Sequence, residues 1–342
     1  MAAERQSLAF VICVERGPLE QQALLLVRSI RRWAGAYADN PIHAFRPRAG
    51  PRLEPDTYSG LSELGVALHE EVLNRDHHDY VHINPTYCML WAERHLDEEI
   101  IVWCDSDEVF LSEPSDFDLP AGIDAAGTGP YYRSPPGPKS TGLGDPNDPY
   151  WKRMYELAGV TAEPFMTALA DGARLRAFYN GGLIVFRRPV GLAAEWLELF
   201  ELLLARRHIP DYGILNVDQL ALAAMMARRP EAVVQLDHRY NHNLALRAQL
   251  PEPERSYELA DLVSVHYHIW FNRRGFLDDL RPALSRESDR YRWLQGYLPL
   301  EPVNDRPLPH LPDRGRSRGR PGRRSLRRRL RRRLRRRRLR RG

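Results

Sequence analysis

Cysteine is scarce in this sequence. Only Cys13, Cys88 and Cys104 occur among 342 residues, and each lies in an apolar run. An odd number of widely spaced cysteines gives neither a disulfide framework nor the paired spacing of a zinc site. We therefore expect three buried thiols in a reducing compartment.

Long hydrophobic runs are missing as well. No segment approaches the roughly 18 apolar residues that a membrane-spanning helix needs. The apolar run at residues 8–14 is seven residues long and lacks the cleavage pattern of a signal peptide. We expect a cytoplasmic protein, either free or peripheral at the inner membrane face.

Acidic residues are absent from the C-terminal end, where residues 314–342 hold 18 arginines and no Asp or Glu. The whole chain has 50 basic and 45 acidic residues, so residues 1–313 hold 32 basic against 45 acidic ones, a net charge of −13. The sequence therefore predicts an acidic globular domain over residues 6–300. A Pro- and Arg-rich, disordered basic tail would follow over residues 301–342.

Three interpretations of this tail stay open. Leu326, Leu330 and Leu334 form a narrow helical stripe among arginines, and basic amphipathic segments attach to anionic membrane surfaces. Contact with nucleic-acid phosphates is a second interpretation. No RNA-binding fold or basic aromatic face accompanies the tail, so we expect no dedicated nucleic-acid binding. A solvated extension without a dedicated role is the third.

Short apolar runs alternate with amphipathic stretches along the chain. The runs predict strands at residues 8–14, 41–45, 65–69, 99–104, 182–186, 233–236 and 262–268. The amphipathic spacing predicts helices at residues 19–33, 86–96, 150–158, 192–207 and 217–228. This alternation predicts an α/β fold with a mainly parallel sheet. Residues 127–149, rich in Gly, Pro and Ser, are expected to form a long loop.

Two carboxylates, Asp105 and Asp107, directly follow the predicted strand at residues 99–104. Ligands of open α/β sheets bind at the carboxyl ends of strands. Paired aspartates at that place could hold a divalent cation and leave positions open for the oxygens of a diphosphate. An isolated Asp-x-Asp is more often a solvated turn, but its place after an apolar strand puts the two interpretations on equal terms.

Four blocks of the sequence together resemble GT-A-fold glycosyltransferases, in particular family 8, the glycogenin and lipopolysaccharide galactosyltransferase group. The blocks occur in the family's order at residues 87–119, 178–186, 216–222 and 263–268, within a resemblance over about residues 8–276. The resemblance implies a GT-A fold, a mixed, mostly parallel sheet flanked by helices. It also implies transfer of a sugar, with retention, from a nucleotide-diphospho-sugar, expected to be a UDP-sugar, to an acceptor whose class stays open.

The same resemblance implies a metal site for Mn²⁺ or Mg²⁺. Asp105, Asp107 and His266 would hold the cation against the diphosphate, and Asp105 would also reach the ribose. His266 and His268 alternate on the predicted strand and would therefore point the same way. We expect His268 to bind substrate, as a phosphate contact or as a support of the metal ligands. A structural histidine is the alternative for both.

Two further motifs would face the sugar. Asp218 and Gln219 match family residues near the anomeric carbon and the acceptor, so we expect them to be catalytic. Helix capping is the alternative for Asp218. Asn180, Gly181 and Gly182 precede a strand and are expected to bind substrate, because glycine lets the backbone approach a ligand closely. A tight turn is the alternative there.

The sequence departs from the family after its late histidine, where a phosphate-binding lysine is usual. Arg273 or Arg274 stands near that place, and we assign the phosphate contact to Arg273 because a guanidinium binds phosphate oxygens in pairs. Glu15, at the end of the first strand, is expected to border the nucleotide.

Two other functions stay open. A nucleotidyltransferase acting on a sugar phosphate would need a glycine-rich basic loop, of which residues 15–18 are a poor version. A non-catalytic nucleotide-sugar-binding protein is the other alternative.

Overall fold

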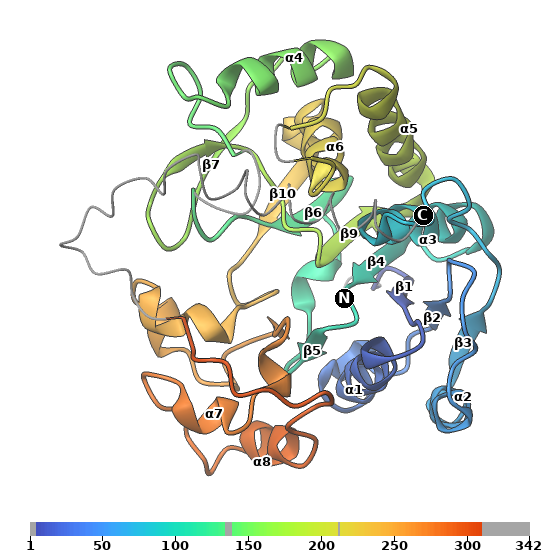
Figure 1. Cartoon of the computed structure of the whole chain (residues 1–342), viewed down its shortest axis with the longest axis vertical. Coiled ribbons are helices and arrows are strands. Elements are labelled where there is room, and N and C mark those ends of the chain that lie inside the picture. Colours follow the sequence, from blue (N-terminus) through green and yellow to red (C-terminus); the bar gives the residue numbers. More distant parts are fainter. Residues whose placement is uncertain (1–4, 134–138, 211–212, 310–342) are drawn as a thin grey trace, which may run out of the picture. The chain divides into compact units, whose positions relative to one another are not determined.

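The computed structural model describes residues 5–133, 139–210 and 213–309. Within them, one sheet has seven strands. These are β1 (Leu8–Cys13), β2 (Ile42–Phe45), β3 (Val66–His69), β4 (Ile100–Cys104), β6 (Ala125–Thr128), β9 (Leu183–Arg187) and β10 (Val233–Leu236). Their order across the sheet is β10-β6-β9-β4-β1-β2-β3 (Figure 1). Of these seven, β9 alone runs antiparallel to its neighbours.

Apolar side chains alternate across the sheet and build a core on each face. Val11 and Ile101 belong to the core under α3 (Asn84–His95), α5 (Leu192–Ala205) and α6 (Val217–Ala227). Phe10 and Ile100 belong to the opposite core, under α1 (Pro18–Trp33) and α2 (Pro55–Glu63). Figure 1 shows these two helical layers on either side of the sheet. The predicted α/β class, with a mixed and mostly parallel sheet flanked by helices, is confirmed.

A short two-stranded ribbon beside the main sheet sets the geometry of the site. β5 (Glu108–Phe110) pairs antiparallel with β11 (Ser264–His266), so that His266 lies opposite Glu108. The prediction of one strand over residues 262–268 is wrong in its extent, because β11 ends at His266. His268 has a φ of 50°, in the left-handed region that a strand does not use.

The remaining elements lie outside the main sheet. They are α4 (Asp148–Ala158), the hairpin of β7 (Phe165–Thr167) and β8 (Arg174–Arg176), α7 (Phe276–Asp279) and α8 (Asp289–Gln295). A third apolar cluster joins β5 and β11 to α7 and α8. The expected loop at 127–149 begins with the end of β6 and closes with the start of α4.

The structure describes residues 301–309 of the predicted tail, where Asn304 pairs with Arg273. Residues 310–342, with the arginine-rich stretch, lie outside the described residues. In the part of the chain that the structure describes, no helix has the length and apolarity needed to cross a membrane.

Candidate active site

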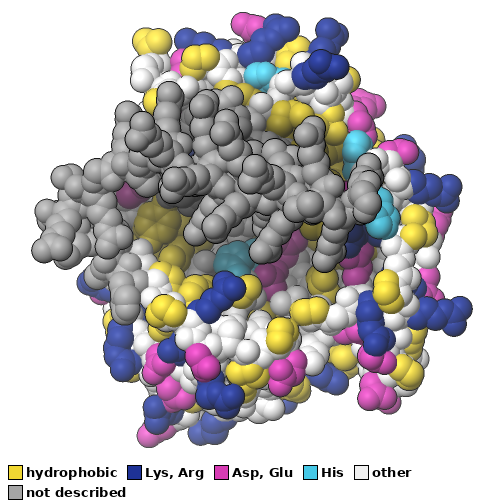
Figure 2. All heavy atoms as spheres, viewed as in Figure 1, with side chains coloured by type: hydrophobic (Ala, Val, Ile, Leu, Met, Phe, Trp, Pro, Cys, Tyr) yellow, Lys and Arg dark blue, Asp and Glu magenta, His cyan; other side chains and the backbone are white. Residues whose placement is uncertain are grey.

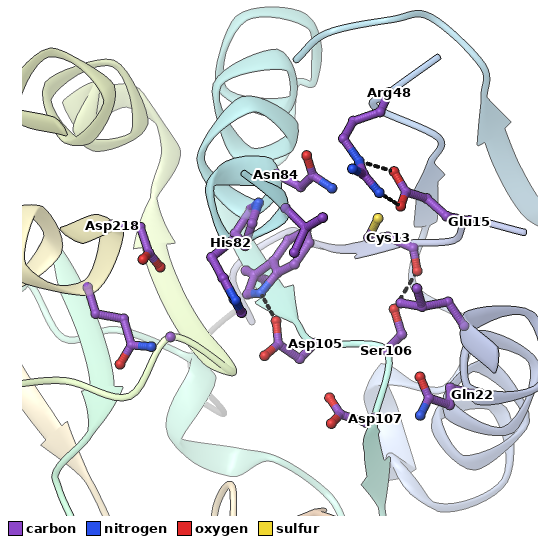
Figure 3. A pocket seen from close by; sticks show the side chains of 16 residues that line it. Cys13, Glu15, Gln22, Arg48, His82, Asn84, Asp105, Ser106, Asp107 and Asp218 are labelled. Carbon is purple, nitrogen blue, oxygen red and sulfur yellow. Dashed lines mark hydrogen bonds and ion pairs between the residues drawn. The ribbon is translucent and has the colours of Figure 1, made fainter. Parts of the chain in front are cut away.

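A cavity of about 360 Å³ lies at the carboxyl ends of β1 and β4 (Figure 3). Six residues that the sequence singled out line it: Glu15, Asp105, Asp107, Gly181, Asp218 and Gln219. The parallel pairing of β1 with β4 explains why segments so distant in the sequence meet here. We call this space the first cavity.

A second cavity of about 470 Å³ adjoins the first and shares His82, Asp105, Asp107 and Gln219 with it. Four more of the predicted residues line it: Asn180, Gly182, His266 and His268. Figure 2 shows a hollow in this face of the molecule where histidine and acidic side chains gather. Both volumes fall within the usual range for ligand sites, ≈ 300–1,000 Å³.

Asp107 stands between two histidines. Its Oδ1 lies 3.1 Å from Nε2 of His266, and its Oδ2 lies 3.7 Å from Nδ1 of His268. Oδ2 of Asp105 lies 3.9 Å from the same Nε2 of His266. The β5–β11 pairing produces this arrangement, and the backbone N–H of Tyr267 donates to the carbonyl of Asp107 at 3.0 Å.

The charges in this cluster are strongly coupled. Burial disfavours the charged form of His266, but the neighbouring Asp107 outweighs it and raises the pKa of His266 to about 10. Asp107 itself is desolvated, yet His266 and His268 hold its pKa well below the usual range. Burial and the repulsion of Asp107 raise the pKa of Asp105 to about 6. The positively charged side chain of His266 therefore offsets negative charge on the neighbouring carboxylates, Asp105 and Asp107.

Glu108 is a member of the site that the sequence did not reveal. It is fully buried, and its Oε1 lies 3.8 Å from Nδ1 of His266, on the side of the ring away from Asp107. Burial raises the pKa of Glu108 to about 8. The ring of His266 thus lies between two carboxyl groups, although Nδ1 of His266 and the carboxyl oxygens of Glu108 make no hydrogen bond to the described residues.

The donor set fits a divalent cation. One ligand atom each of Asp107, His266 and His268 lie within 4.8 Å of one another. Carboxylate oxygens suit Mg²⁺ and Mn²⁺ alike, whereas Mg²⁺ accepts imidazole less readily. The mixed set therefore favours Mn²⁺. This group of three includes His268, which we predicted as a substrate contact. Asp105, which we predicted as a ligand, is not in the group but lies next to it.

Asp218 lies on the side of the first cavity opposite Glu15 and Arg48 (Figure 3). It is the second residue of α6, and Asn216 occupies the N-cap position. The hydroxyl of Tyr80 donates a hydrogen bond to Oδ1 of Asp218. Burial raises the pKa of Asp218 to about 6 even though this hydrogen bond favours the charged form. Asp218 is thus a buried carboxylate that borders the cavity.

Gly182 is the glycine of the site at which a neighbouring side chain, that of His266, comes closest to the backbone. Its carbonyl accepts from the N–H of Asp105 at 2.7 Å, and its N–H donates to Oδ1 of Asn180 at 2.8 Å. A methyl group at this position would lie 2.6 Å from Cε1 of His266 and 3.1 Å from Oδ1 of Asn241. The ring of His266 can therefore keep its place only beside a glycine.

We expect Gly182→Ala to displace His266 and to weaken Mn²⁺ binding at least about 10-fold, as loss of groups that orient metal ligands does. The overpacking should also cost about 1–3 kcal/mol of stability. Gly50→Ala is the matched control, because a methyl group there meets nothing within 4 Å. Calorimetric titration with Mn²⁺ and thermal melts measure both effects. Unchanged Mn²⁺ affinity in Gly182→Ala would remove His266 from the metal site.

The prediction that Arg273 contacts phosphate is not supported by its position. Arg273 lines neither cavity. Its guanidinium pairs with Asp279 at 2.5 Å and donates to the carbonyl of Arg306 at 2.7 Å. Residues 269–276 likewise line neither cavity.

Three cavity residues with basic side chains escaped the sequence analysis. Arg48 lies in the first cavity and donates from Nε to Glu15 at 2.8 Å. Lys139 lies in the second cavity, and His82 lies in both. None of them stands in a recognisable motif, and only the tertiary fold brings them to the site.

The family comparison decides what kind of domain this is. Residues 10–229, more than half of the chain, match the model of the Rhodobacterales glycosyltransferase domain. The chain belongs to this family. Its membership confirms the predicted glycosyltransferase class. The likeness to family 8 in particular stays a prediction.

Solved structures similar to this glycosyltransferase domain include glycosyltransferases of low identity. WbbM, described as a bifunctional glycosyltransferase, is 13% identical over 87% of this chain and 53% of its own, with a TM-score of 0.48. GlyE of Streptococcus pneumoniae TIGR4 is 12% identical over 86% and 60%, with a TM-score of 0.46. An active-site mutant of LgtC is 12% identical over 85% and 96%, with a TM-score of 0.45. The chain thus spans about half of WbbM and three fifths of GlyE. No curated protein matches it significantly.

Proposed function

We propose that this glycosyltransferase domain transfers a sugar from a UDP-sugar, with Mn²⁺ or Mg²⁺ as cofactor and with retention at the anomeric carbon. The proposal rests on one observation. Two carboxylates and two imidazoles gather beside the adjoining cavities, and each lies no more than 3.9 Å from another of the four: Asp105, Asp107, His266 and His268. The UDP donor and the retention follow from the likeness to family 8. We also propose that the reaction takes place in the cytoplasm.

The first cavity would hold the nucleotide. It lies at the carboxyl ends of parallel strands, where nucleotides bind in α/β sheets. Glu15 and Arg48 line it as an ion pair, and the guanidinium of Arg48 could bind a phosphate of the nucleotide. Asp105 accepts a hydrogen bond from Nε1 of Trp103 at 2.8 Å, which fixes one oxygen and leaves the other free for a ribose or a cation.

Asp107, His266 and His268 would hold the cation, with Asp105 as a further oxygen donor. A bound divalent cation would neutralise the negative charge that develops on the leaving diphosphate. The protein's part is to hold these side chains in position. Gly182 leaves room for the ring of His266, and Glu108 lies behind that ring at 3.8 Å.

Asp218 and Gln219 would act on the sugar. A buried carboxylate near the anomeric carbon favours the positive charge that develops there as the bond to the diphosphate breaks. The hydroxyl of Tyr80 orients the carboxylate of Asp218. Gln219 lines both cavities and so can contact donor and acceptor alike.

Calorimetric titration of UDP-glucose and UDP-galactose, with Mn²⁺ and after chelation of metal, tests the proposal. We expect binding that depends on the metal. A ligand at a hundred times its dissociation constant should also stabilise the protein by about 2.7 kcal/mol in thermal melts. Equal binding with and without Mn²⁺ would contradict the assignment of the cluster, and proton NMR of the product would test retention.

Attachment to an anionic membrane through the tail remains a separate prediction. Deletion of residues 314–342 should abolish co-sedimentation with vesicles that contain phosphatidylserine, and salt should weaken binding by the full chain. Melting temperature and UDP-sugar binding should not change. Equal vesicle binding with and without the tail would refute this role.

A further inference from the structure

The second cavity has the chemical character of a carbohydrate site. Four asparagines and three aromatic residues line it: Asn180, Asn216, Asn241, Asn243, Tyr131, Tyr132 and Phe178. The hydroxyl of Tyr131 accepts from the N–H of Asn243 at 2.8 Å, which fixes the ring in place. Amide groups can pair with sugar hydroxyls, and aromatic faces cover the apolar side of a sugar ring.

Two side-chain oxygens of this cavity are buried without a hydrogen-bond partner among the described residues, and a ligand could supply one. Oδ1 of Asn216 and Oδ1 of Asn241 are buried and make no hydrogen bond to the residues that the structure describes. Four described non-glycine residues have a positive φ, and three of them, Asn216, Asn241 and His268, line this cavity. Strained backbone concentrates at ligand sites, where the surrounding structure holds it.

Among the residues that line this cavity, Lys139 is the one lysine or arginine. Its side chain is buried, donates from Nζ to the carbonyl of Tyr132 at 2.9 Å, and lies 5.5 Å from the ring centre of Phe178. Among the described residues no carboxylate lies within ion-pair distance of Nζ, so two of its three N–H groups remain for a ligand. Burial lowers the pKa of Lys139 to about 8, although the negative charge of Asp171 acts in the opposite direction.

We propose that the second cavity binds the acceptor and that Lys139 selects an acidic glycan, through a carboxylate or a phosphate ester on the acceptor sugar. The proposal rests on the proposed function, because the acceptor needs a donor in the adjoining first cavity. Lys139 does not line the first cavity, where Arg48 is the cation. Its unpaired charge is therefore assigned to the acceptor and not to the nucleotide.

The test titrates three probes into the full chain, with and without saturating UDP and Mn²⁺: methyl β-glucuronide, glucose 6-phosphate and neutral methyl β-glucoside. We expect at least one acidic probe to bind at least 10-fold more tightly than the glucoside. Lys139→Gln should remove this difference and leave UDP binding unchanged. Lys152→Gln is the matched control, because Lys152 is half exposed and pairs with Asp148 at 3.1 Å.

Each outcome distinguishes the possibilities. A preference for the glucuronide alone assigns a carboxylate, and a preference for the sugar phosphate alone assigns a phosphate ester. Equal binding of all three probes, including no binding, would overturn the proposal. Weaker UDP binding in Lys139→Gln would overturn it too, because Lys139 would then serve the donor. Failure of UDP itself to bind would count against the proposed function, and the titrations without UDP still report on Lys139.

Discussion

Replacing Asp107 with asparagine should weaken Mn²⁺-dependent binding of a UDP-sugar on the order of 100-fold or more. Loss of a group that merely supports a metal ligand costs 10–100-fold in affinity, and Asp107 faces both His266 and His268. The substitution keeps size and removes the charge. Calorimetric titration of UDP-glucose and UDP-galactose with Mn²⁺ measures the loss.

The melting temperature of unliganded Asp107→Asn should fall. The variant loses the attraction to His266 and His268, which outweighs the relief of the repulsion with Asp105, since the pKa of Asp107 lies well below its usual range. Asp56→Asn is the charge-matched control, because Asp56 is exposed in the first turn of α2 and lines neither cavity. Native Mn²⁺-dependent affinity in Asp107→Asn would remove the carboxylate pair from the site.

Asp218→Asn should lower turnover about 100-fold while nucleotide binding is spared. Removing one group that stabilises transition-state charge typically costs 10²–10³ in rate, and Asp218 lies across the first cavity from Glu15 and Arg48 (Figure 3). Asparagine can still accept the hydrogen bond of Tyr80, so the fold should be kept. Steady-state rates of UDP release and calorimetric UDP binding separate the two effects.

The pH dependence supplies a second test of Asp218. Its pKa is about 6 in the folded protein, against about 3.9 when unfolded. Turnover of the native protein should therefore fall as the pH drops through about 6 and the carboxylate gains a proton. The folded state binds the proton of Asp218 more tightly than the unfolded state does. The stability that this proton contributes is therefore fully present below about pH 4 and is lost as the pH rises from about 4 to 6.

Asp218→Asn removes this titration, so at pH 7.5 its melting temperature should hold or rise. Native turnover in Asp218→Asn would instead leave Asp218 with a merely structural role, because asparagine keeps the hydrogen bond from Tyr80. Asp56→Asn again provides the comparison for loss of one negative charge. Gln219→Ala should lower turnover as well and spare UDP affinity.

The sequence predicted those parts of the fold that a single segment encodes. The apolar runs of β1, β4 and β9 are buried along most of their length, so composition alone marks them as strands. β6 escaped prediction because Ala125, Ala126 and Gly127 have little β preference, and its neighbours in the sheet place it. The Asp pair was found because it directly follows such an apolar run.

The contacts within the site depend on tertiary register and could not be predicted. Glu108 reads as part of an apolar strand, and only its pairing opposite His266 gives it a place behind the imidazole. Lys139 and Arg48 come from loops without a motif. For Arg273, nearness in sequence to the late histidine suggested a phosphate contact, whereas the structure pairs its guanidinium with Asp279 and places it at neither cavity.

Phosphorus NMR of a UDP-sugar incubated with the full chain and Mn²⁺, without acceptor, tests the central claim most directly. We predict slow release of UDP and free sugar that stops when the metal is chelated and in Asp107→Asn, and that continues in Asp56→Asn. When pyrophosphate is added, formation of UTP together with the sugar 1-phosphate would instead indicate a nucleotidyltransferase. Two results would contradict the account: binding of the UDP-sugar without any turnover, or turnover that neither chelation of the metal nor Asp107→Asn reduces.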